Sequence, residues 1–388
     1  MPTESEVQIA AFLRSVRERF GRPAAISCDM SRDILAAVAA ELRGVPVYLC
    51  HFHFLRDSGN DLLGPDYAVI RARLRNHGVK AGLKRLRRDL RDTVGADAER
   101  LRKLVEQAAQ AEPGTIDARD IPYEALVGIL AGAVLDAEHE GDGCGFPFDR
   151  PHLLFFRQAG TVLRTIEALR DAAHLPDAPR RLFARLAGLL APLCADRVLC
   201  TAAADLETQA ELFDRLRTAM RLAEPGGRTG LNDDGADTPM STVMKAVERL
   251  CEEVRNDKAL MRDPRVAAML EQIDTRREHL FAAPITLMTP AGPRLLQPQR
   301  TNNILERLFR SVNRATCRRV GRPAAEVDIN RMPVDIPLLA NLNNPLYLEA
   351  VFDGASSLAE RLSRVDRKIL DDTLADMHRP EAGLNRKL

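Results

Sequence analysis

A strand, a helix and a second strand follow one another closely near the start of this chain, and they constrain its fold more than any other stretch. Residues 23–28 form a short, mostly apolar run that ends at Asp29. Residues 33–43 place apolar side chains at helical spacing, Gly44 breaks that pattern, and residues 45–50 are apolar again. We therefore expect a parallel α/β unit with Asp29 at the carboxyl end of its first strand, where α/β sheets place their chemistry.

Residues 301–321 form the second informative stretch, which reads as one amphipathic helix. Thr301 or Asn302 offers a side-chain oxygen to cap its first free N–H groups. Apolar side chains recur on one face, and Glu306 lies on another face beside basic residues. Two interpretations follow: Glu306 forms an ordinary i,i+4 ion pair with Arg310, or it converges with a second carboxylate. The basic residues that trail it are Arg307, Arg310, Arg314, Arg318 and Arg319.

Cys50 and His53 follow the second strand as a Cys-x-x-His sequence. The chain resembles the DDE transposases of bacterial insertion sequences, in the broad group related to Mutator-like elements. Three features carry the resemblance: an Asp at a strand end, this Cys-x-x-His signature, and a distant Thr-Asn-Asn-x-x-Glu helix with trailing arginines. The resemblance covers roughly residues 1–65 and 300–322. It implies part of an RNase H-like core, with Asp29 as the second catalytic Asp, Glu306 as the catalytic Glu, and Cys50 with His53 as the accompanying signature.

The resemblance also implies a metal cofactor and a substrate. In that family two Asp and one Glu hold two divalent ions, so we expect Mg²⁺ or Mn²⁺ at Asp29 and Glu306, and DNA transposon ends as the substrate. No Asp precedes Cys28, so the first catalytic Asp is expected to be missing and the chain to begin partway through the core. Two carboxylates alone favour one weakly bound ion over a two-ion site. Asp33 is an alternative third ligand, although capping its own helix competes with that role.

Two functions from different classes are compatible with these residues. The first is a transposase that cleaves and transfers DNA strands, with a separate N-terminal polypeptide or a second copy of the chain as a partner. The second is a catalytically inactive remnant that binds DNA or a protein. In either case a sheet that lacks its first strand has an apolar edge, which the predicted helix over residues 6–20 covers or another chain pairs with.

Cys50 and His53 allow a further alternative, because thiolate and imidazole are good Zn²⁺ ligands. They supply only two of the four ligands that a structural zinc needs. A more economical role is that His53 hydrogen-bonds near Asp29 and orients it, while Cys50 packs beneath; His51 is a second candidate for that role. A plain core histidine is equally compatible with the pattern.

The rest of the chain predicts a helical protein with one strongly basic region. We expect an α/β unit with a large all-α insertion, mostly helical overall. Lys84, Arg87 and Arg88 lie on a helix within that region, where they suit contact with DNA phosphates and equally suit a solvated surface. The predicted parts are the N-terminal part of the truncated core at residues 1–65, the helical insertion at 66–299, the returning catalytic-type helix at 300–322 and a helical tail at 323–388.

Composition restricts the environment more than the function. The formal charge of +1 does not by itself indicate a nucleic-acid partner. Seven scattered cysteines, an odd number, favour reduced thiols over disulfides. Neither a signal peptide nor an apolar run long enough to span a bilayer is present in the sequence, so we expect a cytoplasmic protein with no membrane partner.

Overall fold

A computed structural model describes residues 5–91, 123–141, 143–172, 177–222, 239–289, 292–298, 300–301 and 358–364. The described residues fall into two compact units. The first comprises those up to Ala283 together with those between Gln297 and Asn302; the second comprises those between Pro284 and Leu296 and those after Asn303. The described chain is mostly helical, with few strands in two small sheets, as the sequence predicts.

The predicted strand, helix and strand are present at the start of the first unit. Strands β1 (Ile26–Cys28) and β2 (Val47–Leu49) pair in parallel, with Ile26 opposite Val47 and Cys28 opposite Leu49. Helix α2 (Arg32–Glu41) is the crossover between them, and it buries Ala37 and Val38. Gly44, at a φ of 71°, turns the chain back toward β2 because a residue without Cβ adopts that conformation at little cost.

Helix α1 (Glu6–Phe20) precedes the sheet and packs against α2. Arg14 and Arg17 both pair with the Glu41 carboxylate at the end of α2, and Arg17 also donates to the Glu41 backbone oxygen at 2.7 Å. No side chain of α1 is buried, and Phe12 and Phe20 are largely exposed. Coverage of the sheet edge by this helix therefore stays a prediction.

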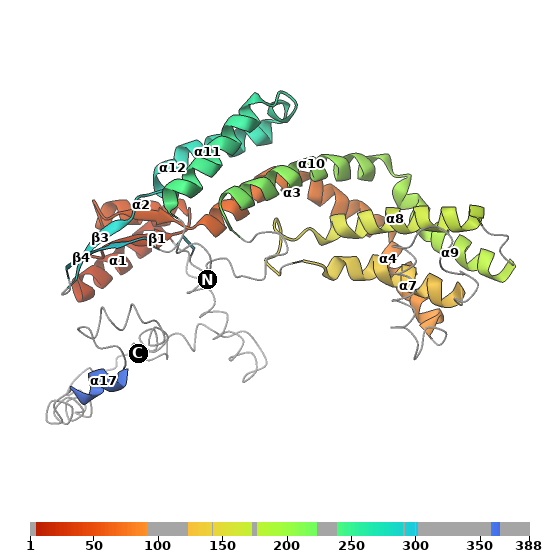
Figure 1. The fold of residues 1–388 in the computed structure, drawn as a ribbon, viewed down its shortest axis with the longest axis horizontal. Coiled ribbons are helices and arrows are strands. Elements are labelled where there is room, and N and C mark those ends of the chain that lie inside the picture. The colour runs from red at the N-terminus through yellow and green to blue at the C-terminus, as the bar shows by residue number, and fades with distance from the viewer. Residues whose placement is uncertain are drawn as a thin grey trace. The chain divides into compact units, whose positions relative to one another are not determined.

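A long helix, α3 (His51–His77), begins immediately after β2 and leads away from the sheet. It packs along α10 (Arg197–Ala219), and Figure 1 shows the two helices side by side. Gly59 of α3 lies where the two helices and the loop at Pro147 meet. The helix continues through Pro65, and the boundary between core and insertion expected at residue 65 stays a prediction.

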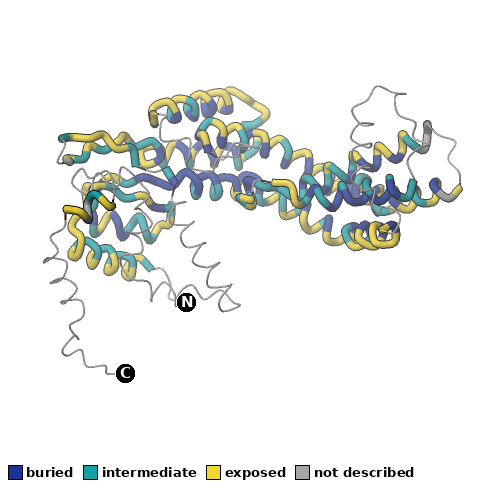
Figure 2. Tube along the Cα trace, turned by 60° about the horizontal axis from the view of Figure 1, so that its bottom comes forward, coloured by how far each residue is buried: buried dark blue, intermediate teal, exposed yellow. Residues whose placement is uncertain are grey.

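Four further helices pack with α3 and α10 in the first unit. Their buried side chains are mainly Leu, Val, Ala and Phe. Figure 2 shows buried residues on the inner faces of the packed helices and exposed residues on their outer sides. Asp196 caps α10 by accepting a hydrogen bond from the Leu199 N–H, and Arg73 and His77 of α3 bind the same carboxylate at 2.7 and 2.8 Å. The helices are α4 (Val79–Asp89), α7 (Tyr123–Asp136), α8 (Pro151–Ala172) and α9 (Asp177–Cys194).

Helices α11 (Met240–Asn256) and α12 (Pro264–Leu280) are also among the described helices of the first unit. Asp263 caps α12 and also pairs with Arg265, whose guanidinium reaches Asp66 of α3. The C-terminal end of α12 lies beside β2, because the Tyr48 hydroxyl donates to the Ala283 oxygen. Short 3₁₀ turns follow α7 (η2, Ala137–His139) and precede α12 (η3, Leu260–Arg262).

The second unit contains one hairpin and one short helix among its described residues. Strands β3 (Ile285–Thr289) and β4 (Gly292–Leu296) pair antiparallel, with Ile285 opposite Leu296. The sequence does not predict this pairing. Helix α17 (Leu358–Ser363) is the described part of the predicted C-terminal tail. The predicted helix over residues 301–321 lies outside the described residues, apart from Thr301.

Among the described residues, no single helix is long and apolar enough to cross a membrane. One pair of helices has sufficient length and apolar composition only when the two are taken together, and it is bent by 70° between Pro179–Cys194 and Arg197–Ala219.

Candidate functional site at the carboxyl edge of the parallel sheet

Asp29 lies immediately after β1, at the edge where both parallel strands end. The Cys50 N–H donates to the Cys28 oxygen at 2.8 Å, which holds the two strand ends together. The Asp29 side chain is half-buried, and its Oδ1 accepts a hydrogen bond from the Ser31 N–H at 3.0 Å. This bond fixes the orientation of the carboxylate, and it is the only hydrogen bond that Asp29 makes among the described residues. The position agrees with the sequence prediction.

The two cysteines at this edge are packing residues. Cys28 and Cys50 are both buried, and Cys50 occupies the N-cap position of α3. Burial, with smaller effects from the Asp29 carboxylate and from Cys50, raises the pKa of the Cys28 thiol to about 11. Cys28 is therefore a neutral thiol at physiological pH, which does not suit a nucleophile. Cys50 is 1% exposed, and its predicted role beneath the site stays a prediction.

Two histidines of the first turn of α3 have different surroundings. His53 is half-buried, and its ring packs edge-on against Phe52 at a centroid separation of 5.8 Å. Its predicted role in orienting Asp29 stays a prediction. His51 is only 1% exposed, and its Nε2 donates to the Leu280 oxygen at the end of α12, at 2.7 Å. Burial lowers the pKa of His51 to about 4, so the ring is neutral at pH 7.

Arg300 reaches the same edge from far along the chain, and no motif or spacing in the sequence indicates this contact. Its backbone oxygen accepts the His51 N–H at 2.8 Å. Its guanidinium donates to the Met220 oxygen at 2.8 Å and to the Arg221 oxygen at 3.4 Å, just beyond the end of α10. Burial lowers the pKa of Arg300, and the adjoining Thr301 is only 1% exposed. Residues 300 and 301 are therefore fixed beside the carboxyl ends of both strands.

The second predicted catalytic residue, Glu306, lies outside the described residues, as do Arg307, Arg310, Arg314, Arg318 and Arg319. Within the part of the chain that the structure describes, no group of three or more His, Cys, Asp and Glu side chains is close enough to hold a metal ion. Asp29 fits the chemistry of a Mg²⁺ ligand, because it is an oriented carboxylate at a sheet edge with one oxygen not engaged by Ser31. It supplies one ligand of the set that such an ion requires.

The basic residues predicted to contact DNA lie on the outer face of α4. Lys84 and Arg88 are exposed and form no ion pair with any described residue, whereas Arg87 pairs with Asp136 of α7 at 3.4 Å. Arg85 and Arg91 are likewise exposed and without an acidic partner in the described ranges. The apolar side chains Val79, Leu83 and Leu86 face the opposite way, into the core. This surface therefore presents cations that no described carboxylate neutralises.

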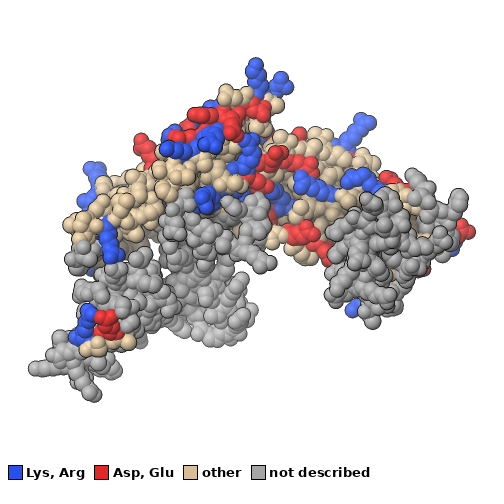
Figure 3. Space-filling model, viewed as in Figure 1, with Lys and Arg blue, Asp and Glu red and all other residues tan. Residues whose placement is uncertain are grey.

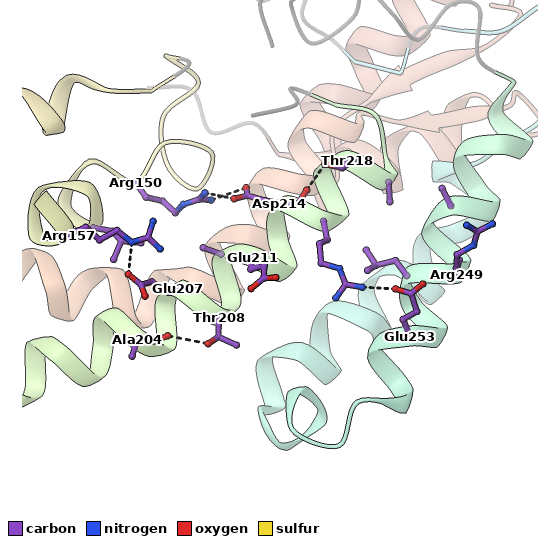
Figure 4. Close-up of a pocket in the computed structure, with 16 residues that line it drawn as sticks. Arg150, Arg157, Ala204, Glu207, Thr208, Glu211, Asp214, Thr218, Arg249 and Glu253 are labelled. Atoms are coloured by element: carbon purple, nitrogen blue, oxygen red, sulfur yellow. Dashed lines mark hydrogen bonds and ion pairs between the residues drawn. The ribbon is translucent and has the colours of Figure 1, made fainter. Parts of the chain in front are cut away.

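A groove between α8, α10 and α11 has a volume of about 1070 Å³. Its charged side chains largely neutralise one another: Arg150 binds Asp214, Arg157 binds Glu207, and Arg215 binds Glu253 (Figure 4). On the face drawn in Figure 3, basic and acidic side chains also alternate over α11 and α12. The groove has no field of one sign, and it lacks the converging titratable groups of a reactive centre.

No protein-family model, curated protein or solved structure matches this chain. The features that bear on its function are Asp29 at the carboxyl edge of the β1–β2 sheet and the exposed basic residues of α4.

Proposed function

We propose that this chain is a transposase-like protein that binds Mg²⁺ or Mn²⁺ with Asp29 and Glu306 and cleaves and transfers DNA strands. In this proposal β1, α2 and β2 belong to an RNase H-like core, and the chain acts together with a second polypeptide or a second copy. Two carboxylates hold one divalent ion weakly, so the partner supplies the remaining acidic ligand.

One observation supports this proposal above the others. The backbone of Arg300 is docked on the N-terminus of α3, next to the strand end that carries Asp29. Glu306 follows Thr301 by five residues, and a chain of five residues spans at most about 18 Å. Two acids that are distant in sequence are thus connected to one sheet edge by a short length of chain.

The protein's own groups account for part of the chemistry. The Ser31 N–H holds the Asp29 carboxylate in one orientation, and the strand ends beneath it are buried. A carboxylate on this rigid edge can hold an ion that polarises a phosphodiester and orients the attacking oxygen, which is what the metal supplies in such reactions. Lys84 and Arg88 contribute sequence-independent contact with DNA phosphates at a distance from the reacting bond.

Titration with Mn²⁺ tests the shared ion directly. Calorimetry on the full chain should show Mn²⁺ binding that Asp29→Asn and Glu306→Gln each weaken at least tenfold, while the double variant binds no more weakly than either single variant, because the two residues act on one ion. Asp205→Asn, which changes an exposed acid on α10, is the matched control and should bind as the wild type does. Unchanged Mn²⁺ affinity in Glu306→Gln would refute the shared site.

A second function is favoured by a specific observation: Lys84 and Arg88 of α4 are exposed and have no acidic partner among the residues that the structure describes. A catalytically inactive DNA-binding remnant has those cations but no functional metal site. The two functions are separated by incubating the full chain with supercoiled plasmid DNA and Mg²⁺ or Mn²⁺. A transposase-like enzyme should nick or join the plasmid in a manner that depends on Asp29. Salt-sensitive binding of the plasmid with no cleavage, identical in wild type and Asp29→Asn, would identify the remnant instead.

A further inference from the structure

The groove between α8, α10 and α11 has an open floor of small side chains. Helix α10 forms this floor, since ion pairs join it to α8 on one side and to α11 on the other. Ala204, Thr208 and Thr218 of α10 line the groove and are exposed, and side chains of this size let another helix approach closely. The volume of about 1070 Å³ exceeds the usual range of small-molecule pockets, so the groove suits part of a protein surface.

Two charged residues in this groove have no partner among the residues that the structure describes. They are Glu211 of α10 and Arg249 of α11, and both are exposed. Glu211 lies one helical turn before Arg215, and Arg249 lies one turn before Glu253. Arg215 and Glu253 form the ion pair that joins the two helices, and Figure 4 shows Glu211 on one side of it and Arg249 on the other. The surface therefore carries a negative and a positive charge, each one turn from a neutral centre.

A partner on this surface must present a cation to Glu211 and an anion to Arg249. A second copy of the chain does so when a two-fold axis passes through the Arg215–Glu253 ion pair, because Glu211 of each copy then faces Arg249 of the other. Such a surface is self-complementary, whereas an unrelated protein would need the same two charges at the same spacing. The formal charge of +1 also gives two copies little net repulsion.

We propose that this α10–α11 surface binds a second copy of the chain, with Glu211 of each copy paired to Arg249 of the other. Under the two-fold rotation, α11 of each copy lies over the small side chains on the α10 floor of the other copy. The proposed function names a second copy as one of two partners, and this inference adds the surface that binds it. It requires neither the metal site nor DNA, so the two proposals are tested separately.

Sedimentation velocity of the full chain, without metal or DNA, measures the association. The wild type should form a dimer whose fraction rises with protein concentration and falls with added salt, because salt screens exposed charges. Glu211→Arg and Arg249→Glu each place like charges opposite one another, so each should raise the dissociation constant of the dimer about tenfold or more. The double variant reverses both charges and should dimerise as the wild type does.

Mixing the two single variants separates pairing between copies from pairing within one chain. In an equimolar mixture of Glu211→Arg and Arg249→Glu, every substituted residue faces a residue of opposite charge on the other variant. The mixture should therefore form heterodimers with wild-type affinity, which pairing within one chain cannot produce. Arg181→Glu, the same charge reversal at an exposed arginine of α9 outside the groove, is the matched control and should dimerise as the wild type does.

The oligomeric state decides the outcome. A wild type that stays monomeric at every concentration would overturn the inference, as would a dimer that both single reversals leave intact. Two monomeric variants whose mixture also stays monomeric would overturn the pairing of Glu211 with Arg249. A dimer that binds no Mn²⁺ contradicts only the proposed function, and a monomer that binds Mn²⁺ contradicts only this inference.

Discussion

Adding one methyl group at Gly59 is expected to lower the free energy of unfolding. A Cβ built at this position of α3 would lie 2.6 Å from Cε2 of Phe213 on α10 and 2.8 Å from Cβ of Pro147, and closer still to Cγ of Pro147. Real carbon contacts are not this short, so one of the two neighbours must move. Both are rings with little freedom to do so. Gly59→Ala therefore tests whether α3 and α10 are packed as closely as the structure shows.

The magnitude follows from two opposing effects. Overpacking a close-packed core costs about 1–3 kcal/mol, and two rigid neighbours place this site toward the upper part of that range. Alanine in a helix interior recovers about 0.5–1 kcal/mol relative to glycine. The net expectation is a loss of roughly 1–2 kcal/mol in the free energy of unfolding. Gly188→Ala is the matched control: it lies in α9 with no atom within 4 Å of the new methyl group, so it should gain about 0.5–1 kcal/mol.

Urea unfolding followed by circular dichroism measures both variants on the full chain. The two midpoints should move in opposite directions from the wild type, with unchanged slopes. A Gly59→Ala protein as stable as the Gly188→Ala protein would show that the close approach of α3, α10 and the Pro147 loop is wrong.

Three further predictions concern charge. Hydrogen bonds from Arg73, and secondly from His77, hold the pKa of Asp196 well below its usual range. The ionised carboxylate therefore stabilises the fold above its ordinary pKa, and this stabilisation is lost as pH falls below about 5. In Asp196→Asn the free energy of unfolding, measured by urea unfolding, should depend less on pH below about 5. The pKa of His51 is lowered to about 4 in the folded protein, so as pH falls the unfolded chain binds a proton at this residue before the folded chain does. The free energy of unfolding should therefore decrease between pH 6.5 and 4 in the wild type and decrease less in His51→Gln. Replacing Lys84 and Arg88 together with Gln should weaken binding to duplex DNA equally for unrelated sequences and reduce the slope of log affinity against log salt by about 1.8, as fluorescence anisotropy would show.

The helices could be predicted from sequence because their apolar residues repeat locally. Within the stretch expected to be helical, the structure has α11 at Met240–Asn256 and α12 at Pro264–Leu280. Helix α10 begins at Arg197, because Asp196 caps it. The alanines that follow obscure the apolar stripe of that first part, whereas the cap is a single residue whose partners come from α3.

The candidate site could be predicted only where it is local. Asp29 directly follows a short apolar run, so its place at the strand end can be read from neighbouring residues. The docking of Arg300 depends on carbonyls at residues 220 and 221, and the burial of His51 depends on the end of α12. No periodicity or spacing in the chain encodes such contacts between distant segments. The pairing of β3 with β4 was missed for a related reason, since its register is settled between strands and not within either one.

Helix α3 begins at the site and ends under the basic face. It contains 27 residues, and at about 1.5 Å per residue it is roughly 40 Å long. If a helix of that length moves as one piece, a tilt of about 5° at its first turn displaces its far end by roughly 3.5 Å. A force applied where α4 follows α3 would therefore reach His51 and His53 as a small rotation of the first turn of α3.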